Sequence, residues 1–311
     1  MAKFRLVALD LDGTLLNSAL KLSEANAEAL REALDAGVQV VLATSRWYGL
    51  ALRTAVRLGI ETPLICSNGA IVKRPSDGSE LLHLHLEEEI AREVVALADE
   101  RAWETYTTIG EATYMRMRPG IIPEKLPAGL RVADRQAEHL SEGRPTSVLV
   151  YGEGAVDEIS SRFLALYGDR CRFSINRPAN SPHYVVLTHP EAEKAKALEL
   201  VCGEMGIAPE ETLAMGDSES DLGMLSLAGL GVAMGNSPDA VKGGALHIAP
   251  SNDADGVAWA RQWRFAVCAV APTSRRRPSS ARTARWSSGR RASFSRRYRR
   301  SRVRLSAGQP Q

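Results

Sequence analysis

The sequence predicts an α/β protein with a Rossmann-like parallel sheet core and a second, smaller α/β domain inserted into it. Short apolar runs recur along the chain and end at polar clusters, and helical segments separate them. This alternation of strand and helix is typical of a parallel sheet that helices cover on both faces. A central stretch breaks the alternation, and 311 residues suffice for about two domains.

The expected core strands are short apolar runs bounded by polar residues. They are residues 4–9 (FRLVAL), 39–43 (QVVLA), 63–67 (PLICS), 212–215 (TLAM), 230–234 (LGVAM) and 245–249 (ALHIA). The helices between them carry boundary signals of their own. The first helix is preceded by Ser23 and followed by Gly37, residues 50–58 precede Gly59, and residues 191–205 precede Gly206.

The middle of the chain contains a different series of elements. It comprises a strand-like run at 80–86 (ELLHLHL), an amphipathic helix at 87–102, strands at 112–118 and 147–153, and a helix at 156–167. We therefore expect a core domain of residues 1–83 and 183–263, in which YVVL (184–187) is the returning core strand. The inserted domain is expected at residues 84–182.

Composition excludes several classes of protein. A hydrophobic content of 44% is normal for a folded chain and argues against wholesale disorder. Four widely spaced cysteines form no metal clip or disulfide framework, which favours a reducing cytoplasm. The first apolar run is cut by two aspartates, and no run reaches the length of a membrane-spanning helix. The sequence therefore predicts a soluble cytoplasmic protein with no membrane partner.

The formal net charge of +2 hides two unlike segments. Residues 264–311 hold 14 of the 39 basic residues and no acidic one, which leaves 25 basic against 37 acidic residues in 1–263. An arginine- and serine-rich segment without hydrophobic periodicity is expected to be disordered. It could bind nucleic acid, lie against the acidic domain, or be an out-of-frame translation product, and we expect nucleic acid to be a poor candidate partner.

Two aspartates follow the first expected strand directly, in the segment DLDGTL (10–15). Ligands of open α/β sheets bind at this carboxyl end of the strands. Asp10 and Asp12 can point the same way along an extended chain, and two such acids favour a bound cation, for which Mg²⁺ is suited. A solvated turn is the alternative for this motif on its own.

Three further polar clusters lie at the same edge of the expected sheet. Thr44, Ser45 and Arg46 follow QVVLA, Lys194 begins the helix after YVVL, and GDSESD (216–221) follows TLAM. Carboxyl ends of parallel strands and helix starts share the anion-binding side of such a sheet. Each cluster alone fits an ordinary surface, but their joint occurrence favours one crevice that holds acids, a hydroxyl and an ammonium group.

This ordered set resembles the haloacid dehalogenase-like superfamily, and most closely its Cof-type phosphatases with an inserted α/β cap domain. The resemblance extends over residues 4–263, and further matching segments are 68–70 (NGA), 235–242 (GNSPDAVK), 251–253 (SND) and 255–258 (DGVA). It implies that Asp10 is the nucleophile and that Asp12 is a general acid and then a base. It also implies a Mg²⁺ ion held by Asp10, the carbonyl of Asp12, and Asp217.

The resemblance also implies a phosphate-binding set and two supporting residues. The phosphate-binding set is Leu11, Thr44, Ser45, Arg46, Lys194 and Ser220, and the supporting residues are Asp221 and Asn68. Two positions depart from the family pattern, because Ser45 replaces a glycine and Ser220 replaces an asparagine. Ser45 is expected to crowd the site if its position needs a glycine-only conformation, and Ser220 reaches less far than asparagine.

These observations predict a Mg²⁺-dependent phosphatase of small phosphorylated metabolites, with sugar phosphates as the leading class and flavin-precursor or pyridoxal phosphates as others. One alternative is a phosphomutase of the same architecture. Another is a non-catalytic nucleic-acid-binding protein that uses the basic segment. His83 and His85 alternate like metal ligands but have no obvious third partner, so a half-exposed strand is the preferred interpretation. The substrate and the oligomeric state stay open.

Overall fold

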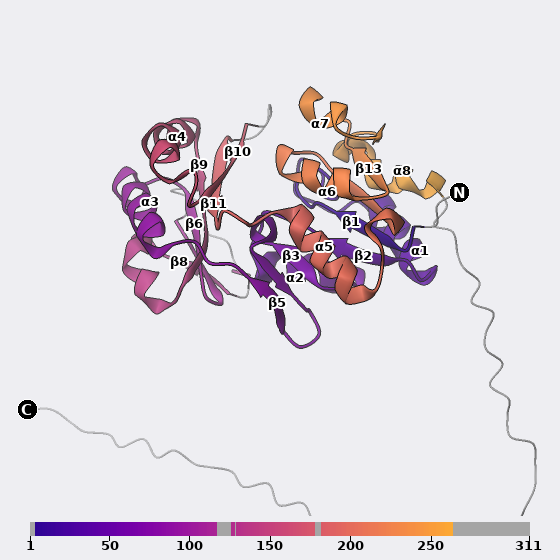
Figure 1. Cartoon of the computed structure of the whole chain (residues 1–311), viewed down its shortest axis with the longest axis horizontal. Helices are drawn as coiled ribbons and strands as arrows, with labels where there is room; N and C mark the ends of the chain where they lie inside the picture. The colour runs from indigo at the N-terminus through magenta and orange to yellow at the C-terminus, as the bar shows by residue number, and fades with distance from the viewer. Residues whose placement is uncertain (1–3, 117–125, 128, 178–181, 264–311) are drawn as a thin grey trace, which may run out of the picture. The chain divides into compact units, whose positions relative to one another are not determined.

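The structure is a computed structural model, and it describes residues 4–116, 126–127, 129–177 and 182–263 (Figure 1). The arginine-rich segment 264–311, for which we expected disorder, lies outside the described residues. Three sheets occur in the described part of the chain, with five, six and three strands. Among these residues, no helix combines the length and the apolar character that crossing a membrane would need.

A five-stranded parallel sheet has the order β14-β13-β12-β1-β2. Its strands are β1 (Leu6–Leu9), β2 (Gln39–Leu42), β12 (Thr212–Gly216), β13 (Leu230–Ala233) and β14 (His247–Ile248). Strand β1 pairs in parallel with both β2 and β12, so three carboxyl ends lie side by side. The predicted parallel α/β core is therefore confirmed.

Helices cover both faces of this sheet because successive side chains of each strand point to opposite sides. Val7 and Leu9 belong to a core cluster with α1 (Glu24–Asp35), α2 (Tyr48–Leu58) and α8 (Gly256–Trp259). The alternate side chains, Leu6 and Ala8, belong to a second cluster with α5 (Lys194–Met205), α6 (Leu222–Leu227) and α7 (Asp239–Gly243).

The expected boundary signals act at three of these helices. The Ser23 side chain accepts a hydrogen bond from the Asn26 N–H at the start of α1. Gly59 and Gly206 adopt the left-handed conformation at the ends of α2 and α5. Helix α5 begins at Lys194, three residues later than expected, because a turn in which the Ala192 N–H donates to the His189 carbonyl precedes it.

The inserted α/β region contains a six-stranded mixed sheet in the order β10-β11-β9-β6-β7-β8. The strands are β6 (Thr105–Ile109), β7 (Ala112–Met115), β8 (Leu130–Val132), β9 (Pro145–Tyr151), β10 (Arg172–Asn176) and β11 (Tyr184–Thr188). Helices α3 (Glu88–Arg101) and α4 (Glu153–Tyr167) lie against one face of it (Figure 1). They bury one alternating set of strand residues, including Val148, Val150 and Leu187.

The structure corrects the expected end of the insertion. We expected residues 183–263 to belong to the core and YVVL (184–187) to be a core strand. Strand β11 instead pairs with β9 and β10 in the six-stranded sheet. The prediction failed because an apolar run of this length fits a strand of either sheet, and only pairing across distant segments decides between them.

The expected core strand at 63–67 is also placed differently. Strands β3 (Leu64–Cys66), β4 (Ile71–Lys73) and β5 (Glu80–His83) form a separate antiparallel sheet. A single parallel bridge between Ala43 and Ile65 joins β3 to the end of the five-stranded sheet. Strand β3 is short because the chain reverses at residues 67–69 and returns as β4.

Candidate active site

Three adjacent strands place the predicted site residues at one edge of the core sheet. Asp10 follows β1, Thr44 follows β2 and Asp217 follows β12. Because β1 lies between β2 and β12, these residues lie at neighbouring carboxyl ends. Ligands of open α/β sheets bind at this edge.

A cluster of three carboxylates occupies this edge. One oxygen from each of Asp10, Asp217 and Asp221 lies within 4.8 Å of the others. The backbone of Gly13 approaches Asp217 so closely that a Cβ there would lie 2.2 Å from Asp217 Oδ2. The Thr14 hydroxyl donates to Asp217 Oδ1 at 3.2 Å. The sequence analysis did not single out Gly13 and Thr14, although both belong to the DLDGTL motif.

Lys194 joins two members of this cluster. Its Nζ lies 2.7 Å from Asp10 Oδ1 and 2.6 Å from Asp221 Oδ1. All three side chains are at least 94% buried, since their exposed fractions are 2%, 6% and 0%. Lys194 reaches them because it is the first residue of α5.

Burial and like charge set the protonation of the cluster. Burial is the largest cause that raises the pKa of Asp10, from 3.8 to about 7, although Lys194 opposes it. Burial, Asp10 and Asp221 raise the pKa of Asp217 well above its usual value. Burial alone would lower the pKa of Lys194, but Asp10 and Asp221 outweigh it and raise that pKa.

These residues fit a divalent cation. The cluster offers hard oxygen atoms close together, and burial and like charge raise the pKa of Asp10 and Asp217, which a bound cation would oppose. The third carboxylate of the cluster is that of Asp221. The family resemblance instead implied that the ion is held by Asp10, Asp217 and the main-chain carbonyl of Asp12. The carboxylate of Asp12 lies elsewhere, as a bidentate partner of Arg46.

The pair between Arg46 and Asp12 changes the expected place of Arg46. We expected Arg46 to bind phosphate, but its Nε and Nη2 both donate to the Asp12 carboxylate. Their side chains are 16% and 30% exposed, so the pair lies at the partly open side of the site. Asp12 and Arg46 are 34 residues apart, and their contact follows from the adjacency of β1 and β2.

The segment 44–46 only partly matches its expected role. Thr44 was expected to bind phosphate, but its N–H donates to the Ile65 carbonyl at 2.9 Å and so is not available to a phosphoryl oxygen. The buried Thr44 hydroxyl accepts from the Arg46 N–H at 3.1 Å and keeps its own proton for donation. Ser45 is outside the left-handed region, so its position needs no glycine.

The loop after β12 is organised by Asp221. Its Oδ2 accepts the N–H groups of Asp217 and Ser218 at 3.0 and 2.9 Å and the Ser218 hydroxyl at 2.9 Å. The Ser220 hydroxyl lies 2.8 Å from the Ser218 hydroxyl. Asp221 thus orients both Asp217 and Lys194, while Ser220 is engaged within its own loop.

A row of aromatic side chains near the site was missed by the sequence analysis. Trp47 stacks on Tyr106 of β6, with ring centroids 5.8 Å apart. Tyr151 of β9 lies 5.9 Å from Tyr106 and 5.4 Å from Tyr184 of β11. Trp47 directly follows Arg46, so the row begins beside the Asp12 pair. The signal was weak because these four residues are scattered over 138 positions of the chain.

His83, the last residue of β5, lies beside His85, and their ring centroids are 4.1 Å apart. His83 contacts Glu80 Oε2 through Nδ1 at 3.0 Å and Thr146 Oγ1 through Nε2 at 2.8 Å. His83 thus uses both ring nitrogens within the protein and links β5 to β9.

A parallel sheet with buried carboxylates and a buried lysine clustered at its carboxyl edge defines an α/β enzyme with an acidic active site. The particular family follows from comparison with known proteins. A model of the haloacid dehalogenase-like hydrolases matches residues 7–260, and the chain belongs to this family. The resemblance that the motifs indicated is therefore confirmed.

Individual relatives agree with this assignment. The chain is 32% identical over 268 residues to the 5-amino-6-(5-phospho-D-ribitylamino)uracil phosphatase YcsE of Bacillus subtilis (strain 168), covering 83% of this chain and 95% of that protein. It is 29% identical over 279 residues to Phosphatase YwpJ of the same organism, covering 82% and 97%. A solved haloacid dehalogenase-like hydrolase from B. subtilis has a TM-score of 0.70 at 26% identity, covering 83% and 99%.

Proposed function

We propose that this hydrolase is a Mg²⁺-dependent phosphatase of small phosphorylated metabolites that works through an aspartyl-phosphate intermediate. The observation that carries the proposal is the buried contact of Lys194 with Asp10 and Asp221 beside Asp217. A lysine and a cation-binding cluster around one carboxylate suit the transfer of a dianionic phosphoryl group. The phosphatase names of YcsE and YwpJ support the same activity.

Asp10 and Asp217, with the carbonyl of Asp12, would hold the Mg²⁺ ion. When bound, the ion supplies positive charge that offsets repulsion between the phosphate and the acids. Asp10 attacks phosphorus, and the bond between phosphorus and the leaving oxygen breaks as Asp12 gives that oxygen a proton. Asp12 then takes a proton from water, whose oxygen attacks the aspartyl phosphate and regenerates Asp10.

Other groups of the chain would bind the phosphoryl oxygens. The Thr44 hydroxyl, the N–H groups of Leu11 and Ser45, and the Lys194 ammonium group are proposed for this role. Arg46 is placed to hold the Asp12 carboxylate in position through both steps. Asp221 supports the site by orienting Lys194 and the Asp217 loop.

We also propose that residues 84–188 form a cap domain, with its six-stranded sheet over the active site. Contacts between the two regions support this placement, since Ser147 of β9 lies 3.4 Å from Ser67 and Trp47 stacks on Tyr106. The cap would exclude water during the attack by Asp10 and would contact the leaving group. Sugar phosphates are the leading substrates, and the name of YcsE adds ribityl phosphates.

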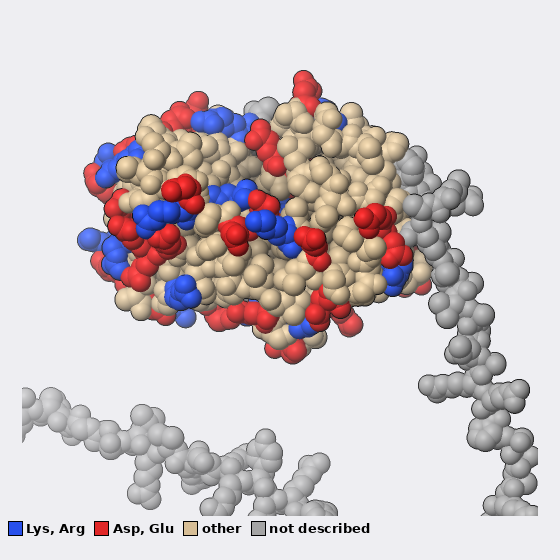
Figure 2. All heavy atoms as spheres, in the orientation of Figure 1, with Lys and Arg blue, Asp and Glu red and all other residues tan. Residues whose placement is uncertain are grey.

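Phosphate release from a panel of phosphorylated metabolites tests this function. The full chain should release inorganic phosphate stoichiometrically with dephosphorylated product. A phosphomutase would instead yield a rearranged ester without free phosphate. DNA binding without any phosphate release would favour the nucleic-acid alternative. On the face shown in Figure 2, acidic and basic side chains of the described residues are intermixed, so that face offers nucleic acid no continuous basic surface.

A further inference from the structure

Three consecutive residues after β3 have a left-handed backbone. Ser67, Asn68 and Gly69 have φ values of 49°, 55° and 93°. Glycine adopts this region freely, but serine and asparagine adopt it at a cost in free energy. Asn68 is therefore held in a conformation that its surroundings must enforce.

Two parts of the active site hold this turn in place. The N–H groups of Ser67 and Asn68 donate to the carbonyls of Arg46 and Thr44 at 2.9 and 3.0 Å. On the other side, a Cβ at Gly69 would lie 2.4 Å from the Glu193 carbonyl oxygen. The turn thus lies between the segment proposed to bind phosphate and the residue that precedes Lys194.

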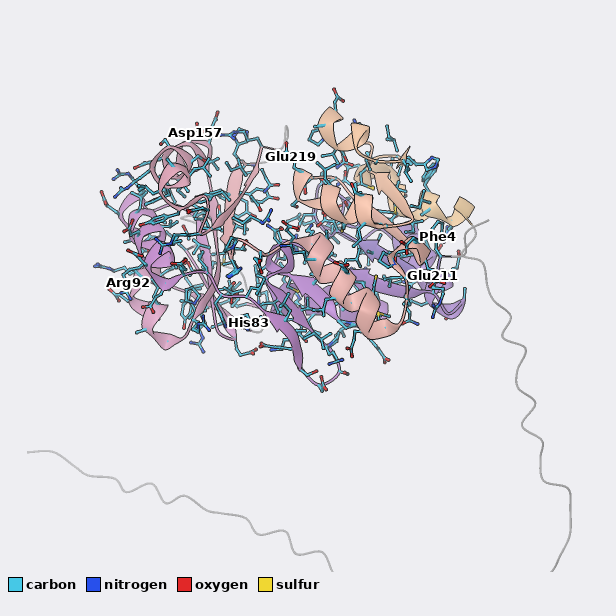
Figure 3. All side chains as sticks on the ribbon, in the orientation of Figure 1. Phe4, His83, Arg92, Asp157, Glu211 and Glu219 are labelled. Carbon is cyan, nitrogen blue, oxygen red and sulfur yellow. The ribbon has the colours of Figure 1, made fainter. Side chains whose placement is uncertain are left out.

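The Asn68 side chain is buried without a hydrogen-bond partner. Its exposed fraction is 2%, and neither Nδ2 nor Oδ1 has a partner among the residues that the structure describes. A buried amide of this kind is costly unless another molecule satisfies it. Asn68 lines a cavity of about 250 Å³ together with Lys194, Ser220, Glu219 and two β10 residues, Arg172 and Ser174. Figure 3 labels Glu219, at the edge of the core that faces β10.

We propose that Asn68 binds the substrate on both sides of the ester bond and selects a leaving group that carries a hydroxyl. The proposal rests on the phosphatase function proposed above. The amide Nδ2 donates to an oxygen of the phosphate ester, and Oδ1 accepts from a hydroxyl of the leaving group. A phosphoryl dianion offers only acceptors, so it satisfies Nδ2 and leaves Oδ1 unpaired. The organic part of the substrate supplies the donor to Oδ1.

The test compares two three-carbon esters, glycerol 3-phosphate and propyl phosphate, which differ in their hydroxyl groups. We expect the wild-type full chain to prefer glycerol 3-phosphate in kcat/KM. Asn68→Gly should reduce that preference by about tenfold or more, and it should raise the KM for p-nitrophenyl phosphate, because the phosphate oxygen loses its contact with Nδ2. Its melting temperature should equal or exceed that of the wild type, because the substitution removes a strained residue and an unpaired buried amide.

Two further variants separate the amide from the backbone. Ser67→Gly relieves the neighbouring strained position, and it should leave the preference between the two esters unchanged. Asn68→Asp keeps the acceptor and the tolerance of a left-handed backbone but loses the NH₂ donor. This variant should raise the KM for both esters and keep the preference for glycerol 3-phosphate.

Several results would overturn the proposal. They are an equal kcat/KM of the wild type for both esters, an Asn68→Gly preference that matches wild type, or a clearly lower melting temperature of that variant. An unchanged KM for p-nitrophenyl phosphate in folded Asn68→Gly would also overturn it, since Nδ2 would then make no contact with the phosphate. If the wild type releases phosphate from none of the esters, the proposed function fails as well, which distinguishes the two failures.

Discussion

Replacing Lys194 by methionine should destabilise the protein strongly and in a pH-dependent way. Methionine has a similar length and no charge, so Lys194→Met leaves the buried carboxylates of Asp10 and Asp221 without their shared cation. Removing one partner of a buried ion pair costs about 3–5 kcal/mol. The side chains of Lys194, Asp10 and Asp221 are only 2%, 6% and 0% exposed, so solvent screening reduces this cost little.

The pH dependence follows from Asp10. Its pKa is raised from 3.8 to about 7 in the folded wild type, and Lys194 is a cause that lowers it. Without Lys194 the folded pKa rises further. A carboxyl group with a raised folded pKa binds more protons folded than unfolded, so stability is lost as pH rises from about 4 through the folded pKa. The loss in free energy of unfolding of Lys194→Met relative to wild type should therefore be small at pH 5 and largest above pH 8.

Urea unfolding in EDTA, followed by circular dichroism at pH 5 and pH 8.5, measures this deficit. At pH 8.5 the variant's midpoint should fall by roughly 1 M urea or more, given typical denaturant slopes. Lys196→Met, an exposed position on the same helix, is the control and should shift little. Added Mg²⁺ should restore part of the loss, because it replaces the missing charge. A Lys194→Met midpoint equal to wild type at pH 8.5 would refute the reasoning.

Three further outcomes are expected. Asp10→Asn should lower phosphate release by roughly 10⁴-fold or more while thermal unfolding shows an unchanged or higher melting temperature, because one of several like charges is removed; substantial turnover by the folded variant would contradict this. EDTA should abolish phosphate release and Mg²⁺ should restore it, and metal-independent turnover would count against the proposed ion. Gly13→Ala places a Cβ 2.2 Å from Asp217 Oδ2 at a φ of +80°, so the Asp217 carboxylate must shift. More Mg²⁺ should then be needed for half-maximal phosphate release, and an unchanged Mg²⁺ requirement would show that Asp217 does not hold the ion.

Local patterns in the sequence predicted much of the core. The run ending at Asp10 is strand β1, Ser23 caps α1, and Gly59 ends α2, as expected. These features depend on neighbours in the chain, such as a capping hydroxyl or a left-handed glycine. The parallel sheet followed from the alternation of such elements.

Features that depend on pairing between distant segments were not predictable in the same way. Strand β11 has the composition of a core strand, yet it completes the six-stranded sheet. The pair of Arg46 with Asp12 and the use of the Thr44 N–H by Ile65 both arise where neighbouring strands end. The left-handed turn at Asn68 is enforced by residues 44–46 and by Glu193, which no local pattern around it encodes.

The most direct test of the account is chemical trapping of the phosphorylated enzyme. The full chain is mixed with a hydrolysable phosphate monoester and Mg²⁺, quenched in acid within the first turnover, digested and mapped by mass spectrometry. The account predicts a phosphoryl group on Asp10 that disappears as inorganic phosphate forms. Phosphate release at the same rate with Asp10 unmodified throughout would contradict it.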